Sequence, residues 1–98
     1  KPGMSMHDLD DGVTKVLEAS EYKDFIVHKT GHGLGMDVHE DPYVMRKNYE
    51  LLEKGMIITI EPGLYRDKYL GIRIEDDVLI TDKGCKSLTS FYRDLRVI

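Results

Sequence analysis

The stretch GIRIEDDVLIT, at residues 71–81, alternates cleanly in side-chain type, and this feature most constrains the fold. Successive side chains of a β-strand point to opposite faces of a sheet. The first face holds Ile72, Ile74, Asp76 and Val78, and the second holds Arg73, Glu75, Asp77 and Leu79. The pattern therefore predicts a strand over these residues, followed by a turn at residues 82–84.

A helix is predicted near the start of the chain. Ser5 can cap its first turn, and Asp8 lies three residues on, in the capping-box position. Apolar residues then recur at helical spacing, which predicts a helix over about residues 6–19. The acidic residues of its first turns, Asp8, Asp10 and Asp11, are interpreted as capping and solvent-facing groups.

Shorter strands are predicted elsewhere in the chain. Apolar or β-rich runs indicate strands over residues 25–27, 56–60 and 86–88. Pro42 indicates a loop where an irregular segment begins, and residues 49–52 indicate a short helical turn. The fold class that these elements predict is α+β, with a mostly antiparallel sheet and a covering helix.

The composition is that of a small, ordinary globular chain. Its 98 residues make one domain at most, with 41% hydrophobic and 33% charged residues. A net charge of −4 argues against nucleic-acid and membrane-surface binding, and no apolar run approaches a membrane span. The single cysteine, Cys85, excludes an internal disulfide, fits a cytoplasmic location and is interpreted as a packing residue. Because the first residue is Lys1, we expect a processed, truncated or excised chain.

Two glutamates are predicted to face each other across a hairpin. If its turn is centred on Lys68, antiparallel pairing places Glu61 directly opposite Glu75 on one face. Opposed residues have Cβ atoms roughly 4.5–5.5 Å apart, and like charges at that distance are destabilising. A shared proton or one or two divalent metal ions would remove the repulsion, and the histidines elsewhere in the chain favour metal. Arg73, on the same face, is expected to steady the carboxylate of Glu75.

The segment HKTGHGLGMDVHE, residues 28–40, contains three of the four histidines and three glycines, and is interpreted as a flexible loop. It lacks the lysine and the spacing of a phosphate-binding loop, and no serine or cysteine is placed as a nucleophile. A histidine near a loop is more often structural than a ligand, His7 included, and glutamates on an exposed strand usually form a solvated face. A slip of one residue would also break the glutamate pair. Spacing alone therefore leaves both a metal site and a structural interpretation open.

Three motifs in order, HKTGHGLGMDVHEDP, GMIITIEPGLY and GIRIEDDVLIT, resemble consecutive signatures of the pita-bread metallopeptidases. KPGMSMHDLD and LTSFYRDL extend the resemblance over nearly the whole chain, to the branch of Xaa-Pro aminopeptidase and prolidase (Xaa-Pro dipeptidase). Methionine aminopeptidase shares the GHG loop and the TIEP strand, but the context of Glu75 is the proline-peptidase pattern. The fold implied is the C-terminal half of a pita-bread (creatinase/aminopeptidase-like) fold.

The resemblance implies a two-metal centre built from two aspartates, one histidine and two glutamates. His32, Glu61 and Glu75 match the histidine and glutamate ligands, with Glu75 bridging the metals. The cofactors implied are two divalent metal ions, manganese or cobalt ahead of zinc or iron.

The resemblance also assigns catalytic roles to His39, Glu61 and His28. Glu61 would take the proton of the attacking water, His39 would polarise the scissile carbonyl, and His28 would contact the substrate. Arg73 matches the arginine beside the last ligand. The implied substrate is a peptide or dipeptide with proline in its second position, and the residues that separate a dipeptidase from an aminopeptidase are expected outside this chain.

The sequence departs from the family because the two aspartate ligands are absent. They are expected upstream of Ser5, and no aspartate before His32 has the family's ligand context. We therefore expect residues 1–98 to be a partial metallopeptidase catalytic domain, its C-terminal half, that is poor or inactive alone. Association as a homodimer or with the missing half-domain is expected. The alternatives are a non-catalytic binding module derived from the pita-bread fold and a methionine aminopeptidase-like enzyme.

Overall fold

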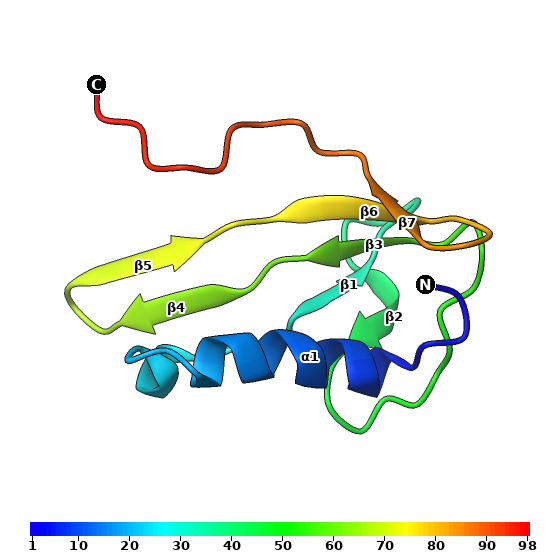
Figure 1. Cartoon of the computed structure of the whole chain (residues 1–98), viewed down its shortest axis with the longest axis horizontal. Coiled ribbons are helices and arrows are strands. Elements are labelled where there is room, and N and C mark those ends of the chain that lie inside the picture. The colour runs from blue at the N-terminus through cyan, green and yellow to red at the C-terminus, as the bar shows by residue number, and fades with distance from the viewer.

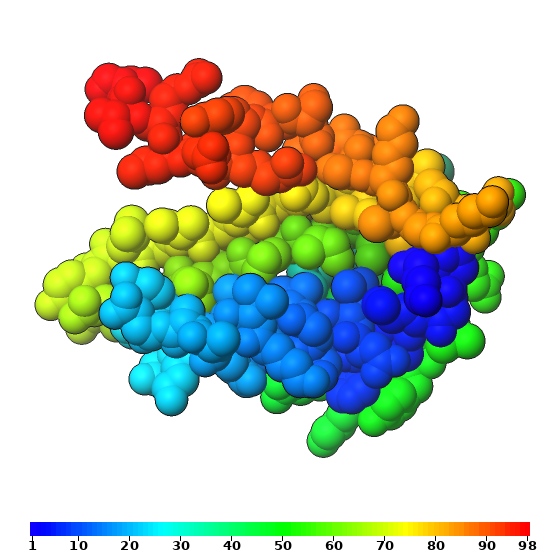
Figure 2. Space-filling view, viewed as in Figure 1, coloured from blue at the N-terminus to red at the C-terminus, as the bar shows by residue number.

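The computed structural model describes all 98 residues. One α-helix lies beside a set of antiparallel strands (Figure 1). Five strands form the main sheet in the order β2-β1-β3-β6-β7, and β4 and β5 form a two-stranded sheet. In the space-filling view, α1 and the segment after β7 lie on opposite sides of the strands (Figure 2). The elements are α1 Met6–Glu18, the 3-10 helix η1 Lys23–Phe25, β1 Gly31–Gly33, β2 Glu40–Val44, β3 Ile57–Ile60, β4 Gly63–Arg66, β5 Leu70–Arg73, β6 Asp76–Ile80 and β7 Cys85–Ser87. The predicted α+β class is confirmed.

Helix α1 begins where the sequence predicts. The Ser5 hydroxyl accepts a hydrogen bond from the Asp8 N–H at 3.0 Å and donates one to the Asp8 carboxylate at 2.7 Å. The first helical residue, Met6, is fully buried and joins the core. The other members of this core are Val44, Leu52, Ile58 and Ile80. Neither α1, with 13 residues, nor the shorter η1 has the length and apolar character needed to cross a membrane.

The β3–β6 ladder of the main sheet and the β4–β5 ladder share one register. Ile60 pairs with Asp76 at the end of the β3–β6 ladder, and Gly63 pairs with Arg73 at the start of the β4–β5 ladder. The two ladders are therefore successive parts of one hairpin. Its turn is centred on Lys68, the centre that the sequence analysis assumes, and Lys68 adopts a φ of 62°.

The long strand predicted from the alternation is divided into β5 and β6 by a break at Ile74 and Glu75. On the opposite strand Pro62 has no N–H to donate, and the Glu61 N–H donates to the Thr30 carbonyl at 2.7 Å instead. Only a 3.4 Å bond from the Ile74 N–H to the Pro62 carbonyl remains between the two ladders. The hairpin therefore opens at the level of its two glutamates.

The glycine-rich segment is not only a loop, because its GHG portion forms β1 between β2 and β3. Any side chain at Gly31 would collide with the Thr59 carbonyl, and any side chain at Gly33 would collide with the Asp41 carbonyl. Glycine is needed here because neighbouring strands approach closely, and conformational freedom is secondary.

Several local predictions are wrong. Pro42 lies within β2, because β2 is an edge strand and the missing N–H of proline leaves no ladder partner unpaired there. Residues 25–27 form no strand: η1 ends at residue 25, and only Ile26 makes a bridge to β4. Residues 49–52 form no helical turn, because this segment pairs with the start of α1. Cys85 is exposed on the other edge strand, β7, where no element covers it.

Asp10 is buried, contrary to the expectation that it faces solvent. Its carboxylate accepts a hydrogen bond from the Thr30 hydroxyl at 2.6 Å. The Thr30 carbonyl in turn accepts the Glu61 N–H. The hydrogen bond between Asp10 and Thr30 joins residues twenty positions apart, so helical periodicity alone does not predict it. Asp10 therefore fixes α1 to the segment that supports Glu61.

We predict that Asp10→Ala lowers the free energy of unfolding by about 1–3 kcal/mol, because it leaves the buried Thr30 hydroxyl unpaired. Urea unfolding of the two proteins measures this difference. Asp11→Ala is the matched control: the exposed Lys15 ammonium, 2.6 Å away, hydrogen-bonds Asp11 and lowers the pKa of its carboxyl. A surface pair of this kind contributes little, so the control should be clearly less destabilising. An equal decrease in the free energy of unfolding in Asp10→Ala and Asp11→Ala would contradict the role given to Asp10.

Candidate active site

Three of the predicted residues converge where the hairpin opens. Ligand atoms of His32, Glu61 and Glu75 all lie within 4.8 Å of one another. The common register brings the two glutamates together across the hairpin. His32 comes from β1, which pairs with β3. His32 Nε2 lies 3.0 Å from Glu61 Oε1.

The orientation of His32 suits a cation. Its Nδ1 lies 2.9 Å from the Gly33 carbonyl, and a carbonyl only accepts, so Nδ1 carries a hydrogen and donates it. In the neutral ring, Nε2 then presents a lone pair to a carboxylate oxygen of Glu61. Two acceptors at that distance need a proton or a cation between them. Histidines that bind metal usually donate their other N–H to a carbonyl or carboxylate in this way.

The donor set is consistent with the metal that the sequence implies. One imidazole nitrogen and two carboxylates suit manganese, cobalt, iron or zinc. His32 and Glu61 are largely buried, with side chains 9% and 12% exposed, so water screens their charges little. These three side chains could hold a divalent ion together with further ligands.

Arg73 bridges the two glutamates. Its Nε lies 3.5 Å from Glu61 Oε2, and its terminal nitrogen lies 3.8 Å from Glu75 Oε2. The sequence predicts an interaction with Glu75 alone, and the structure adds a shorter one with Glu61. The guanidinium is about half exposed, so it neutralises the carboxylate pair only in part.

Thr59 is a member of this site that sequence reasoning misses. Its hydroxyl accepts the backbone N–H of His32 at 3.1 Å and donates to Glu61 Oε1 at 3.2 Å. The side chain is buried, with 1% of the residue exposed. Its position two residues before Glu61, on the same face of the strand, is a signal that could have identified it. Thr59 links the two potential ligands and restricts the carboxylate to one orientation.

The other two predicted histidines lie beside this cluster. The His39 ring centroid is 4.4 Å from that of His32, and the His28 ring packs against Tyr65 at 5.4 Å. Together with Glu61 and Arg73, these histidines line a cavity of about 250 Å³. Its full lining is His28, Lys29, Gly31, His32, His39, Tyr43, Glu61 and Arg73.

Two further residues of this cavity, Lys29 and Tyr43, are not predicted from the sequence as site residues. Glu75 does not line the cavity, although its carboxylate belongs to the ligand cluster. His7 lies elsewhere, packed at a tilt against Tyr49 with ring centroids 5.0 Å apart.

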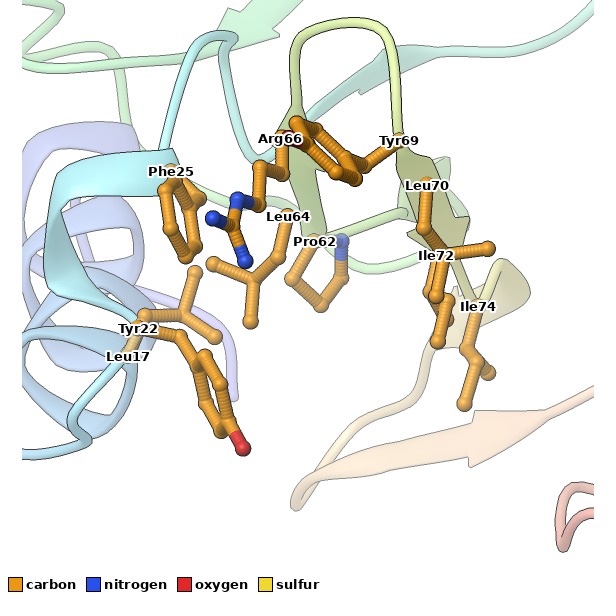
Figure 3. Close-up of a pocket in the computed structure, with 10 residues that line it drawn as sticks. All are labelled: Leu17, Tyr22, Phe25, Pro62, Leu64, Arg66, Tyr69, Leu70, Ile72 and Ile74. Atoms are coloured by element: carbon orange, nitrogen blue, oxygen red, sulfur yellow. The ribbon is translucent and has the colours of Figure 1, made fainter.

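A larger cavity of about 610 Å³ is almost entirely apolar (Figure 3). Leu17, Tyr22 and Phe25 lie on one side of it, and residues of the β4–β5 hairpin lie on the other. Arg66 is the only charged residue in its wall. This larger cavity contains no histidine, cysteine or carboxylate, so the smaller, polar cavity is the candidate reactive site.

The chain belongs to metallopeptidase family M24, whose model matches residues 1–82. It is 44% identical over 95 residues to Xaa-Pro dipeptidase of Pyrococcus furiosus, an alignment that covers 97% of this chain and 27% of that protein. Its structure is similar to the prolidase of the same organism, with a TM-score of 0.91 at 44% identity over 95% of this chain and 28% of the other. An X-Pro aminopeptidase of Thermotoga maritima gives a TM-score of 0.94 at 36% identity, over 100% of this chain and 28% of the other.

The predicted resemblance to the Xaa-Pro branch of the pita-bread metallopeptidases is therefore confirmed, and so is the fold. The chain spans 27% of the length of the Pyrococcus furiosus relative. The expected association with a second copy or with a missing half-domain stays a prediction.

We predict that Thr59→Val weakens manganese binding roughly 10–100-fold, because valine keeps the shape of threonine but fixes neither His32 nor Glu61. Calorimetric titration with Mn²⁺ measures the affinity. Thr59→Ser keeps the hydroxyl and should retain most of the affinity. Circular dichroism checks that each variant is folded. Affinity unchanged in a folded Thr59→Val protein would show that the hydroxyl does not position a ligand.

Proposed function

We propose that this chain carries the His32, Glu61 and Glu75 part of the active centre of a metal-dependent peptidase. The proposed substrates are peptides or dipeptides with proline in the second position. The observation that carries the proposal is the convergence of one imidazole nitrogen and two opposed carboxylates at a polar cavity. Membership of a metallopeptidase family and similarity to a protein named Xaa-Pro dipeptidase support it.

The ligands present are suited to the proposed metal centre. His32, Glu61 and Glu75 would hold divalent ions, with manganese or cobalt favoured and zinc or iron compatible. Such ions supply a nucleophilic water near neutral pH. The proposal does not depend on which of these metals is bound.

The proposed catalytic base is Glu61. Thr59 donates to its Oε1, and Arg73 lies beside its Oε2, so the carboxylate is held in one orientation. A fixed carboxylate that accepts a proton from water and passes it to the leaving proline nitrogen acts as a general base and then as a general acid.

We assign substrate contacts to the other two histidines of the cavity. His39, whose ring lies beside that of His32, would donate a hydrogen bond to the scissile carbonyl as negative charge develops on its oxygen. His28, packed against Tyr65, would contact the bound peptide. These roles follow from the family resemblance and are supported by the position of both rings in the cavity wall.

The proposed two-metal centre needs two further carboxylates. Three ligands come from the residues of this chain, and the aspartates of α1 are not suited to be the others. Asp8 is bonded to Ser5, Asp10 is engaged by Thr30, and Asp11 is paired with Lys15. We therefore propose that the remaining carboxylates come from another polypeptide segment, and that residues 1–98 alone are a poor or inactive peptidase.

A non-catalytic binding module is the second candidate. Descendants of this kind usually lose ligand residues. Here the ligands His32, Glu61 and Glu75 are present and close together, and Arg73 lies beside them. This retention favours the enzyme.

We expect the protein in its full length, loaded with manganese, to hydrolyse Ala-Pro but not Ala-Ala, and a chelator to abolish the activity. Glu61→Gln should lower kcat by roughly 10²–10⁴-fold, because the amide cannot accept the proton. Glu53→Gln, at an exposed position, is the control and should be fully active. Released proline measures turnover. Failure to cleave Ala-Pro with any of the four metals, or full activity of Glu61→Gln, would overturn the proposal.

Residues 1–98 alone, assayed in the same way, should turn over Ala-Pro poorly or not at all. With fewer carboxylate ligands, residues 1–98 alone should also bind the metal ions more weakly. Turnover by this chain alone at the rate of the full-length protein would show that three ligands are sufficient.

A further inference from the structure

Glu75 is the least restrained of the three candidate ligands. Hydrogen bonds orient the side chains of His32 and Glu61. The ion pair of Glu75 is with Arg73, at 3.8 Å, and 41% of the Glu75 side chain is exposed. Glu75 also lies in the break between β5 and β6, outside both ladders. The position of its carboxylate therefore depends on how the backbone on either side of it is held.

The residues directly after Glu75 are held by the segment that follows β7. This segment turns back past the start of β6 (Figure 1). The Leu88 N–H donates to the Asp77 carbonyl at 2.8 Å, and the Asp77 N–H donates to the Thr89 hydroxyl at 2.9 Å. Both backbone polar groups of Asp77 are thus bonded to residues beyond the end of β7.

Arg93 binds the first residue of β6 through two of its nitrogens. Nε donates to Asp76 Oδ2 at 3.0 Å, and a terminal nitrogen donates to Asp76 Oδ1 at 2.6 Å. The Asp76 side chain is only 23% exposed. Surface ion pairs usually contribute little, but two parallel hydrogen bonds from one arginine to one carboxylate are the exception. The pair therefore fixes the residue adjacent to Glu75.

Arg93 acts on Glu75 without touching it. The ion pair of Arg93 is with Asp76. Successive side chains of an extended backbone point to opposite sides, so the side chains of Asp76 and Glu75 diverge. The influence of Arg93 on the ligand therefore passes through the backbone that joins these two residues.

We propose that Arg93, through Asp76, is a positioning residue for the Glu75 carboxylate at the metal centre. This inference rests on the proposed function and extends it to the segment after β7. Groups outside the ligand set often hold a metal ligand in one orientation, and metal affinity falls when they are removed. Without Arg93 the start of β6 would loosen, and the Glu75 carboxylate would adopt several positions. Arg93 itself contacts neither metal nor substrate and takes no part in proton transfer.

The test measures the Mn²⁺ affinity of the full-length protein by calorimetric titration. Arg93→Gln should weaken binding roughly 3–10-fold, less than the 10–100-fold typical of groups that bond a ligand directly, because Arg93 acts through one more residue. Asp76→Asn should have the same effect, and the double variant Asp76→Asn/Arg93→Gln should bind no more weakly than either single variant. Arg96→Gln is the matched control, because the Arg96 guanidinium lies over the Tyr92 ring, 5.4 Å from its centroid, and should leave the affinity unchanged.

The electron paramagnetic resonance spectrum of bound Mn²⁺ separates positioning from a merely structural role. At saturating Mn²⁺, Arg93→Gln should alter the spectrum, because the ligand field changes when Glu75 is displaced, and Arg96→Gln should not. Circular dichroism checks that each variant is folded. Weaker binding with an unchanged spectrum would show a loss of stability alone and would overturn the role of Arg93.

The outcomes also separate this inference from the proposed function. Unchanged affinity and spectrum in Arg93→Gln, with hydrolysis of Ala-Pro intact, overturn the inference and leave the peptidase proposal standing. If the unaltered full-length protein binds no Mn²⁺, the proposed function fails, and hydrogen exchange decides whether Arg93 positions Glu75. Faster exchange of the amide hydrogens of residues 75–77 in Arg93→Gln than in Arg96→Gln would support that role, and equal rates would overturn it.

Discussion

The strand register of the hairpin places Glu61 and Glu75 opposite each other, and this register can change only if the whole hairpin shifts. A slip of one residue would turn each side chain of a strand to the opposite face, so the buried Ile58 and Ile80 oppose it. The two carboxylates must therefore be neutralised where they lie. Arg73 does this in part, from 3.5 and 3.8 Å and with a half-exposed guanidinium. The remaining negative charge, next to the Nε2 of His32, is what makes the site suited to a divalent cation.

The same backbone geometry positions the groups around the carboxylates. β1 approaches β3 closely because Gly31 has no side chain, and this approach brings the His32 N–H to the Thr59 hydroxyl. The Glu61 N–H bonds to Thr30, which is bound through its hydroxyl to Asp10 of α1. The candidate ligands thus lie on or beside paired strands and are supported by buried hydrogen bonds. Sites built in this way are held more precisely than sites on free loops.

Local patterns predicted the elements that local forces determine. Side-chain type and the periodicity of apolar residues are sufficient to predict the helix cap at Ser5, the strands β3 and β7, and the hairpin centred on Lys68. Contacts between distant segments were not predictable in this way. GHG was interpreted as a loop because its glycines suggest flexibility, whereas they serve close strand packing. The burial of Asp10 and the hydrogen bond from the His32 N–H to Thr59 depend on partners twenty or more positions away. The roles expected of His28 and His39 came from family resemblance, because spacing alone did not distinguish them from structural histidines.

Anomalous X-ray diffraction from crystals grown with manganese tests the central claim most directly. The account predicts an anomalous peak between His32 and the two glutamates, at direct ligand distance from Nε2 and from one oxygen of each carboxylate. Such a peak would show that the opposed carboxylates bind a cation. The account would be contradicted if manganese were fully occupied elsewhere in the crystal but gave no peak at this position. In that case the Arg73 guanidinium would lie between the two carboxylates. The glutamate pair would then be a structural ion cluster neutralised by arginine.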